Sequence, residues 1–176
     1  MTAQQRLDNI LWQTSLSAFV TFSGGAPAVC LTEAGPQGLN YLLGSRGYQP
    51  WALVFDRQAV YNAGGGPVWY ARTEQYNALD SAQRHWAVHY APGSDWVEER
   101  EWRVPRPVVP GGATPTVSLD ELGLVAVIVG DPNWIAARYL DHTPQPYAPP
   151  ALFRVPRWWR NPANDSFMEL PPLGSL

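Results

Sequence analysis

Apolar residues along the chain follow short periodic patterns that switch between helix spacing and strand spacing. Leu7, Ile10 and Leu11 recur at helical spacing and predict a helix over residues 5–12. Short apolar runs bounded by glycine, proline and polar turns predict strands. The predicted strands cover residues 28–32, 51–55, 67–71, 97–104 and 124–129, and the β-branched run at 124–129 is expected at the centre of a sheet.

Further helices are predicted between and after these strands. The leucines at 39, 42 and 43 indicate one or two helical turns. Asp56 is a good N-cap for a helix over 57–62, which the glycines at 64–66 then end. Asp80 lies near the cap of a longer helix over 77–90, and Pro132 suits the first turn of a helix over 133–139.

The order of these elements predicts an α/β (α+β) fold with a mixed, split β-sheet core and short helices. A length of 176 residues with 45% apolar content suits one domain with one core. We expect the whole chain to form that single domain, with a core over about 26–140 and a proline-rich surface tail over 143–176. One short strand is expected in this tail, near residues 151–155.

The chain shows no sign of a membrane span or an export signal. No run reaches the roughly eighteen apolar residues of a spanning helix, and the first eleven residues lack the basic start of a secretory signal. We therefore expect a cytoplasmic protein without a membrane partner. The single cysteine, Cys30, allows no internal disulfide and fits a reducing compartment as a small core residue.

The charge pattern limits the classes of partner. The formal net charge is −3 and all twelve basic residues are arginine, which argues against a protein that coats nucleic acid non-specifically. Local basic patches stay possible. The segment 154–160 interleaves arginine and tryptophan, which suits either a nucleic-acid surface or tryptophans packed onto the domain.

Two further patterns are explained by structure rather than by a binding site. His85 and His89 lie four residues apart on the predicted helix and offer two metal ligands, but no third ligand is evident nearby, so no metal site is predicted. The glycines at 64–66 precede a strand rather than a helix, which is the wrong order for a phosphate-binding loop.

The strongest chemical signal is the acidic strand predicted over 97–104. Strand alternation places Glu99, Glu101 and Arg103 on one face, with the two carboxylates about 7 Å apart. Such a pair suits chemistry at a sugar, because one carboxylate stabilises an oxocarbenium-like centre while the other orients a nucleophile. The alternative is a solvated strand face on which Arg103 screens Glu101.

The order of elements resembles the ADP-ribosyltransferase fold, in particular its DarT-type and abortive-infection-associated bacterial groups. Glu99-Arg100-Glu101, followed by Trp102-Arg103-Val104, is similar to the acidic triplet on a late strand of that fold. The segments 28–36, 51–55 and 66–71 resemble the strands that precede it there, so the resemblance covers about residues 26–130.

The resemblance implies that NAD is the substrate and lies in a cleft between two sheets. It assigns Glu101 to the nicotinamide ribose and Glu99 to the acceptor, with Thr32, Tyr48 and Trp51 lining the cleft. The implied activity is transfer of ADP-ribose to a nucleic-acid or protein acceptor in bacterial conflict, as a toxin or in phage defence. The first strand of that fold, which grips the nicotinamide ribose, has no match here. This favours the alternative of a catalytically inactive binding module, an antitoxin or accessory subunit with a cognate partner.

Overall fold

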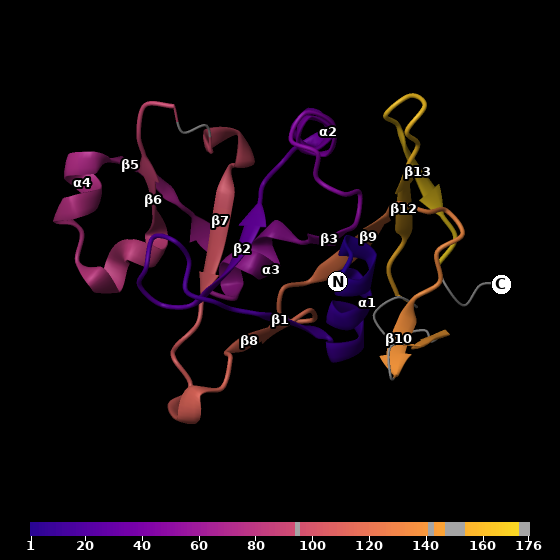
Figure 1. Ribbon diagram of the computed structural model, residues 1–176, viewed down its shortest axis with the longest axis horizontal. Helices are drawn as coiled ribbons and strands as arrows, with labels where there is room; N and C mark the ends of the chain where they lie inside the picture. The colour runs from indigo at the N-terminus through magenta and orange to yellow at the C-terminus, as the bar shows by residue number, and fades with distance from the viewer. Residues whose placement is uncertain (94–95, 141–142, 147–153, 173–176) are drawn as a thin grey trace.

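The computed structural model describes residues 1–93, 96–140, 143–146 and 154–172 (Figure 1). It is a mixed α/β structure with several small sheets and few helices, as the sequence predicts in outline. The helices are α1 (Ala3–Gln13), α2 (Pro36–Gly44), α3 (Arg57–Asn62) and α4 (Thr73–Ala78), with 3-10 turns η1 (Ser81–Trp86), η2 (Val97–Glu99) and η3 (Pro110–Gly112). In the described part of the chain, no helix is long and apolar enough to cross a membrane.

Two sheets dominate the fold. One has the strand order β13-β12-β9-β3, formed by Phe167–Leu170, Arg157–Arg160, Leu124–Val129 and Ala52–Phe55. The other has the order β2-β7-β4, formed by Ala28–Thr32, Glu101–Pro105 and Gly66–Pro67. Only β12 runs parallel to its neighbour β9, and the other pairs in these two sheets are antiparallel.

Three strand pairs complete the fold. They are β1 (Ser15–Ser17) with β8 (Thr116–Ser118), β5 (Trp69–Arg72) with β6 (Ala87–Tyr90), and β10 (Ala137–Leu140) with β11 (Thr143–Pro146). In Figure 1, β5, β6 and α4 lie on one side of β7 and β2, whereas β3 and β9 lie on the other side. The three-stranded sheet therefore stands between the β5–β6 pair and the four-stranded sheet.

Two hydrophobic clusters form the core. One packs α1 against the four-stranded sheet, and its buried members are Leu7, Leu11, Leu119, Val127, Val129, Trp134, Ala136 and Val155. The other packs the three-stranded sheet against α3, and its buried members are Ala18, Val29, Val60, Trp102, Val104, Val117 and Leu122. The core thus extends beyond the predicted range of 26–140 at both ends.

Several local predictions are confirmed, and their physical causes are visible. Thr2 forms a capping box with Gln5 at the start of α1, with the Gln5 N–H 3.2 Å from the Thr2 hydroxyl. The Asp56 carboxylate accepts from the Ala59 N–H at 2.8 Å and caps α3. The strands predicted at 28–32, 51–55 and 124–129 form β2, β3 and β9, with β9 in the interior of its sheet.

The helix predicted over 77–90 is wrong. Asp80 caps only the 3-10 turn η1, and the chain then enters β6, which pairs in parallel with β5. This pairing also divides the strand predicted over 67–71, because β4 joins β7 while β5 joins β6. His85 and His89 consequently do not share a helix face: His85 Nδ1 accepts from the Ala26 N–H at 3.3 Å, and His89 Nε2 lies 2.9 Å from the Thr73 hydroxyl.

The helix predicted over 133–139 is also wrong, and a buried carboxylate explains why. Asp8 on α1 is fully buried and accepts from Trp134 Nε1, the Ala137 N–H and the Tyr139 hydroxyl, each at 3.2 Å. An Ala137 N–H committed to Asp8 is not available for a helical bond. The segment instead turns and forms β10.

The proline-rich tail predicted over 143–176 contributes strands and a buried side chain to the fold. Part of the strand predicted near 151–155, residues 151–153, lies outside the described residues. The tail strands that the structure does describe are β11, β12 and β13. Arg157 on β12 is buried and donates to the Trp134 carbonyl at 3.0 Å and, through Nε, to the Pro171 carbonyl at 3.0 Å. Its guanidinium is therefore committed to the protein interior and is not part of a nucleic-acid surface.

Candidate functional site

The Glu99-Arg100-Glu101 segment is a turn followed by a strand rather than a continuous strand. Glu99 ends the 3-10 turn η2, Arg100 adopts a left-handed conformation at φ 44°, and only Glu101 belongs to β7. The strand predicted over 97–104 is thus wrong for its first four residues. Because the alternation rule applies only within a strand, it does not place Glu99 and Glu101 on one face.

Glu101 forms a closed ion pair with Arg103. Its carboxylate oxygens lie 2.7 Å from Arg103 Nε and 3.2 Å from Arg103 Nη2, a bidentate geometry. The Arg103 side chain is 5% exposed and that of Glu101 is 16% exposed. Arg103 Nη1 also donates to the carbonyls of His85 at 2.9 Å and Ala87 at 3.2 Å. The pair therefore ties β7 to η1 and β6.

Glu99 contacts two of the other predicted site residues. It accepts from the Tyr48 hydroxyl at 2.8 Å, and this bond is the main cause that raises the pKa of Tyr48. The Thr32 hydroxyl donates to the Glu99 backbone carbonyl. Three of the predicted site residues, Thr32, Tyr48 and Glu99, thus meet in space. Trp51 does not join them, because it packs edge-on against Trp134 with ring centroids 5.8 Å apart.

Tyr70 and Cys30 lie beside these carboxylates. The Tyr70 hydroxyl accepts from the Glu101 N–H at 3.0 Å and donates to the Trp96 carbonyl at 3.1 Å. Burial raises the pKa of Tyr70, and the hydrogen bond from the Glu101 N–H partly offsets this rise. Desolvation, followed by the Glu101 carboxylate, raises the pKa of the Cys30 thiol to about 12. Cys30 is exposed on β2 and is not the core residue that the sequence predicts, but its raised pKa keeps the thiol protonated at neutral pH and a poor nucleophile.

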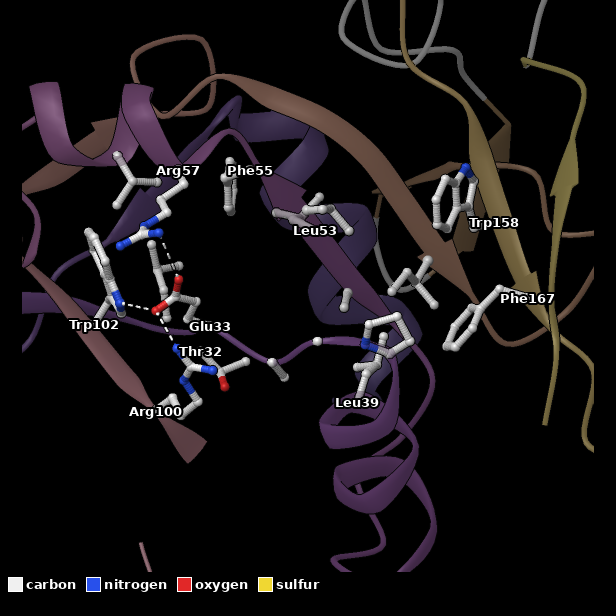
Figure 2. A pocket seen from close by; sticks show the side chains of 18 residues that line it. Thr32, Glu33, Leu39, Leu53, Phe55, Arg57, Arg100, Trp102, Trp158 and Phe167 are labelled. Atoms are coloured by element: carbon white, nitrogen blue, oxygen red, sulfur yellow. Dashed lines mark hydrogen bonds and ion pairs between the residues drawn. The ribbon is translucent and has the colours of Figure 1, made fainter. Parts of the chain in front are cut away.

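A separate cavity of about 570 Å³ lies between the two main sheets, here called the inter-sheet cleft (Figure 2). Its walls come from β2, the loop after it, α2, β3, β7 and the β12–β13 hairpin, and most of its lining is apolar. Figure 2 shows Trp158 and Phe167 at one end of the cleft, Leu39 and Leu53 in the middle, and a charged group at the other end. The lining residues are Leu31, Thr32, Glu33, Ala34, Gly35, Pro36, Leu39, Ala52, Leu53, Val54, Phe55, Arg57, Val60, Arg100, Trp102, Ile128, Trp158 and Phe167.

The charged end of the cleft is built around Glu33. Its carboxylate lies 3.3 Å from Arg57 Nη1 and 3.3 Å from Arg100 Nη2, and it accepts from Trp102 Nε1 at 3.1 Å (Figure 2). The Arg57 and Arg100 side chains are 72% and 63% exposed. Two arginines share one carboxylate here, so this end of the cleft carries a net positive charge with N–H donors open to solvent.

Among the predicted site residues, only Thr32 lines this cleft. Trp102 faces the cleft, and strand alternation turns Glu101 and Arg103 to the opposite face of β7. Sequence reasoning missed Glu33, Arg57 and Tyr70 as site residues. For Glu33 a signal exists, since it is an isolated carboxylate placed immediately after a predicted strand. Arg57 and Tyr70 carry no comparable signal.

Comparison of the chain with protein-family models, with curated proteins and with solved structures found no match.

Proposed function

We propose that this chain is a binding module that acts through the inter-sheet cleft rather than through chemistry at Glu101. The observation that supports this proposal is the build of the cleft itself, with apolar walls and two solvent-open arginines at one end. A volume of about 570 Å³ lies within the range of ordinary ligand sites. The ligand we expect is therefore amphipathic, with an apolar body along the cleft and an anionic group at Arg57 and Arg100.

The position of Glu101 also favours a binding function over catalysis by this carboxylate. A catalytic carboxylate must reach the reacting centre in the cleft, and Glu101 points to the opposite face of β7. Both of its oxygens are held by the buried Arg103, so its charge is already balanced by a cation. A carboxylate in this state contributes to the fold and has little charge left to stabilise an oxocarbenium centre.

Within the bacterial-conflict setting that the resemblance implies, such a module is an antitoxin or accessory subunit that binds a cognate partner. An ADP-ribosyltransferase-like fold is part of this proposal and is supported by the two sheets that flank one cleft. In this proposal the chain keeps an ADP-ribosyltransferase-like fold and lacks the transferase activity.

An anionic aromatic probe tests the cleft directly. Anilinonaphthalene sulfonate should bind saturably, and the Arg57→Gln/Arg100→Gln variant should bind about tenfold more weakly, because a charge-assisted contact to the sulfonate is lost. Arg72→Gln serves as the control, since Arg72 is exposed and pairs only distantly with Glu74, at 4.0 Å. Absence of saturable binding by a fully folded protein, or equal binding by the double variant, would contradict the proposal.

A second candidate is NAD-dependent ADP-ribosyl transfer with Glu99 as the working carboxylate. The convergence of Thr32, Tyr48 and Glu99 favours it, because these three residues were expected together in an NAD site. Release of nicotinamide from labelled NAD, abolished by Glu99→Gln at unchanged melting temperature, would establish this activity. Absence of nicotinamide release and of any thermal shift with NAD or ADP-ribose would exclude it.

A further inference from the structure

The strand β3 meets the inter-sheet cleft with its free edge as well as with one face. All four of its residues, Ala52, Leu53, Val54 and Phe55, line the cleft and are partly exposed. Successive side chains of a strand point to opposite faces, so a cavity that touches four in a row must lie along the strand's backbone. β3 is also the terminal strand of its sheet, with β9 on its other side.

The hydrogen-bond register identifies the backbone groups that this edge presents. The Val127 N–H donates to the Pro156 carbonyl, so the polar backbone groups of Val127 point toward β12. Its partner Leu53 is consequently a non-hydrogen-bonded position of the antiparallel β3–β9 pair. The Leu53 N–H and C=O therefore point away from β9, toward the cleft, and no residue of the described chain bonds to them there.

Natural proteins seldom leave an open apolar strand edge of this kind available for pairing with other chains. Native sheets protect their edges with charged residues, prolines, bulges or a covering element, because an unpaired edge recruits other chains. β3 reads Ala-Leu-Val-Phe and has none of these residues within it. Its one register irregularity lies beyond Leu53, between Val54 and Phe55. The edge at Leu53 is thus competent to accept another strand.

The walls of the cleft and its charge define what can reach this edge. In Figure 2, Leu39 on α2 lies beside Leu53 in the middle of the cleft and Trp158 on β12 lies at one end, so the space along Leu53 suits a single extended segment. Arg57 and Arg100 stand at the Phe55 end of the strand and attract a carboxylate. The apolar residues on both sides accept the alternating side chains of such a segment.

We propose that the inter-sheet cleft receives an extended segment of a partner protein, which adds to β3 as a further strand at Leu53 and places an acidic residue at Arg57 and Arg100. This inference rests on the proposed function and names the class of ligand. Main-chain bonds at Leu53 supply affinity, and the arginines supply selectivity for acidic sequences.

A phage-displayed library of random dodecapeptides, panned against the full chain, tests the proposal. Enriched peptides should carry apolar residues at alternate positions and an aspartate or glutamate near one end. On binding of the synthesised peptide, amide exchange at Leu53 should slow at least tenfold. Leu53→Pro, which removes the open N–H, should weaken binding at least tenfold, whereas Leu53→Val should preserve it.

Two controls keep the result interpretable if Leu53→Pro fails to fold. A peptide with prolines at alternate positions lacks the pairing N–H groups and should not bind the wild-type protein, and a peptide with lysine in place of the acidic residue should bind at least tenfold more weakly. Saturable binding of anilinonaphthalene sulfonate without any enriched peptide, or peptide binding without protection of Leu53, would overturn this inference and leave the proposed function standing. Failure of both probes would overturn both.

Discussion

The Glu101→Gln variant is expected to lose stability, although the sequence suggests a nearly neutral isosteric change on a solvated strand face. Within the described residues, the substitution removes the only carboxylate bound to Arg103, whose side chain is 5% exposed. Glutamine offers one acceptor oxygen where the carboxylate offers two, and its amide group turns N–H donors toward the guanidinium. The buried charge of Arg103 then depends on the carbonyls of His85 and Ala87.

The size of the effect follows from the burial of the pair. Removing one partner of a fully buried ion pair costs about 3–5 kcal/mol. Glu101 is 16% exposed and Arg103 keeps two carbonyl acceptors, so a loss of about 2–3 kcal/mol is expected here. For a chain of this length, that corresponds to a fall in melting temperature of about 4–12 °C.

Thermal and urea unfolding of the wild type, Glu101→Gln and Glu99→Gln measure this difference. Glu99→Gln is the matched control, because its side chain still accepts from Tyr48, and a change below about 0.5 kcal/mol is expected. Nicotinamide release is measured on the same samples. If Glu101→Gln unfolds like the wild type and yet abolishes nicotinamide release, Glu101 is a catalytic group, and our assignment of it to the fold is refuted.

Three further predictions concern Asp8, two glycines with positive φ, and Cys30. Burial raises the pKa of Asp8 above its ordinary value of 3.8, so its stabilising contribution is full below that value and is lost as pH rises through the raised pKa. The melting temperature of the wild type relative to Asp8→Asn should therefore fall as pH is raised from acid toward neutral, and a constant difference would contradict this reasoning. Gly123→Ala places a methyl group 2.7 Å from Ala59 Cβ at φ +65° and should cost about 2–4 kcal/mol in urea unfolding, whereas Gly24→Ala at φ +75° meets open space and should cost about 1–2 kcal/mol. Cys30, with a pKa of about 12, should react with iodoacetamide far more slowly than free cysteine at pH 8, and a rate equal to that of the free amino acid would show that the thiol is not perturbed.

The sequence alone determined the elements that depend on short-range patterns. Helical spacing of Leu7 and Leu11, the side-chain cap at Asp56 and the β-branched run at 124–129 are local features, and the structure confirms α1, α3 and β9 at those places. These features need no knowledge of which distant segments touch.

Only the tertiary structure decided the elements that depend on distant partners. The Asp8 carboxylate, more than a hundred residues earlier in the chain, takes the Ala137 N–H and prevents a helix there. Parallel pairing with β5 converts the last four residues of the predicted 77–90 helix into β6. The left-handed Arg100 separates Glu99 from the strand, and Arg103 binds the Glu101 carboxylate on the face of β7 that is turned away from the cleft. The first two outcomes satisfy a buried carboxylate or a strand edge through a long-range contact, and the periodicity of a single segment carries no information about such contacts.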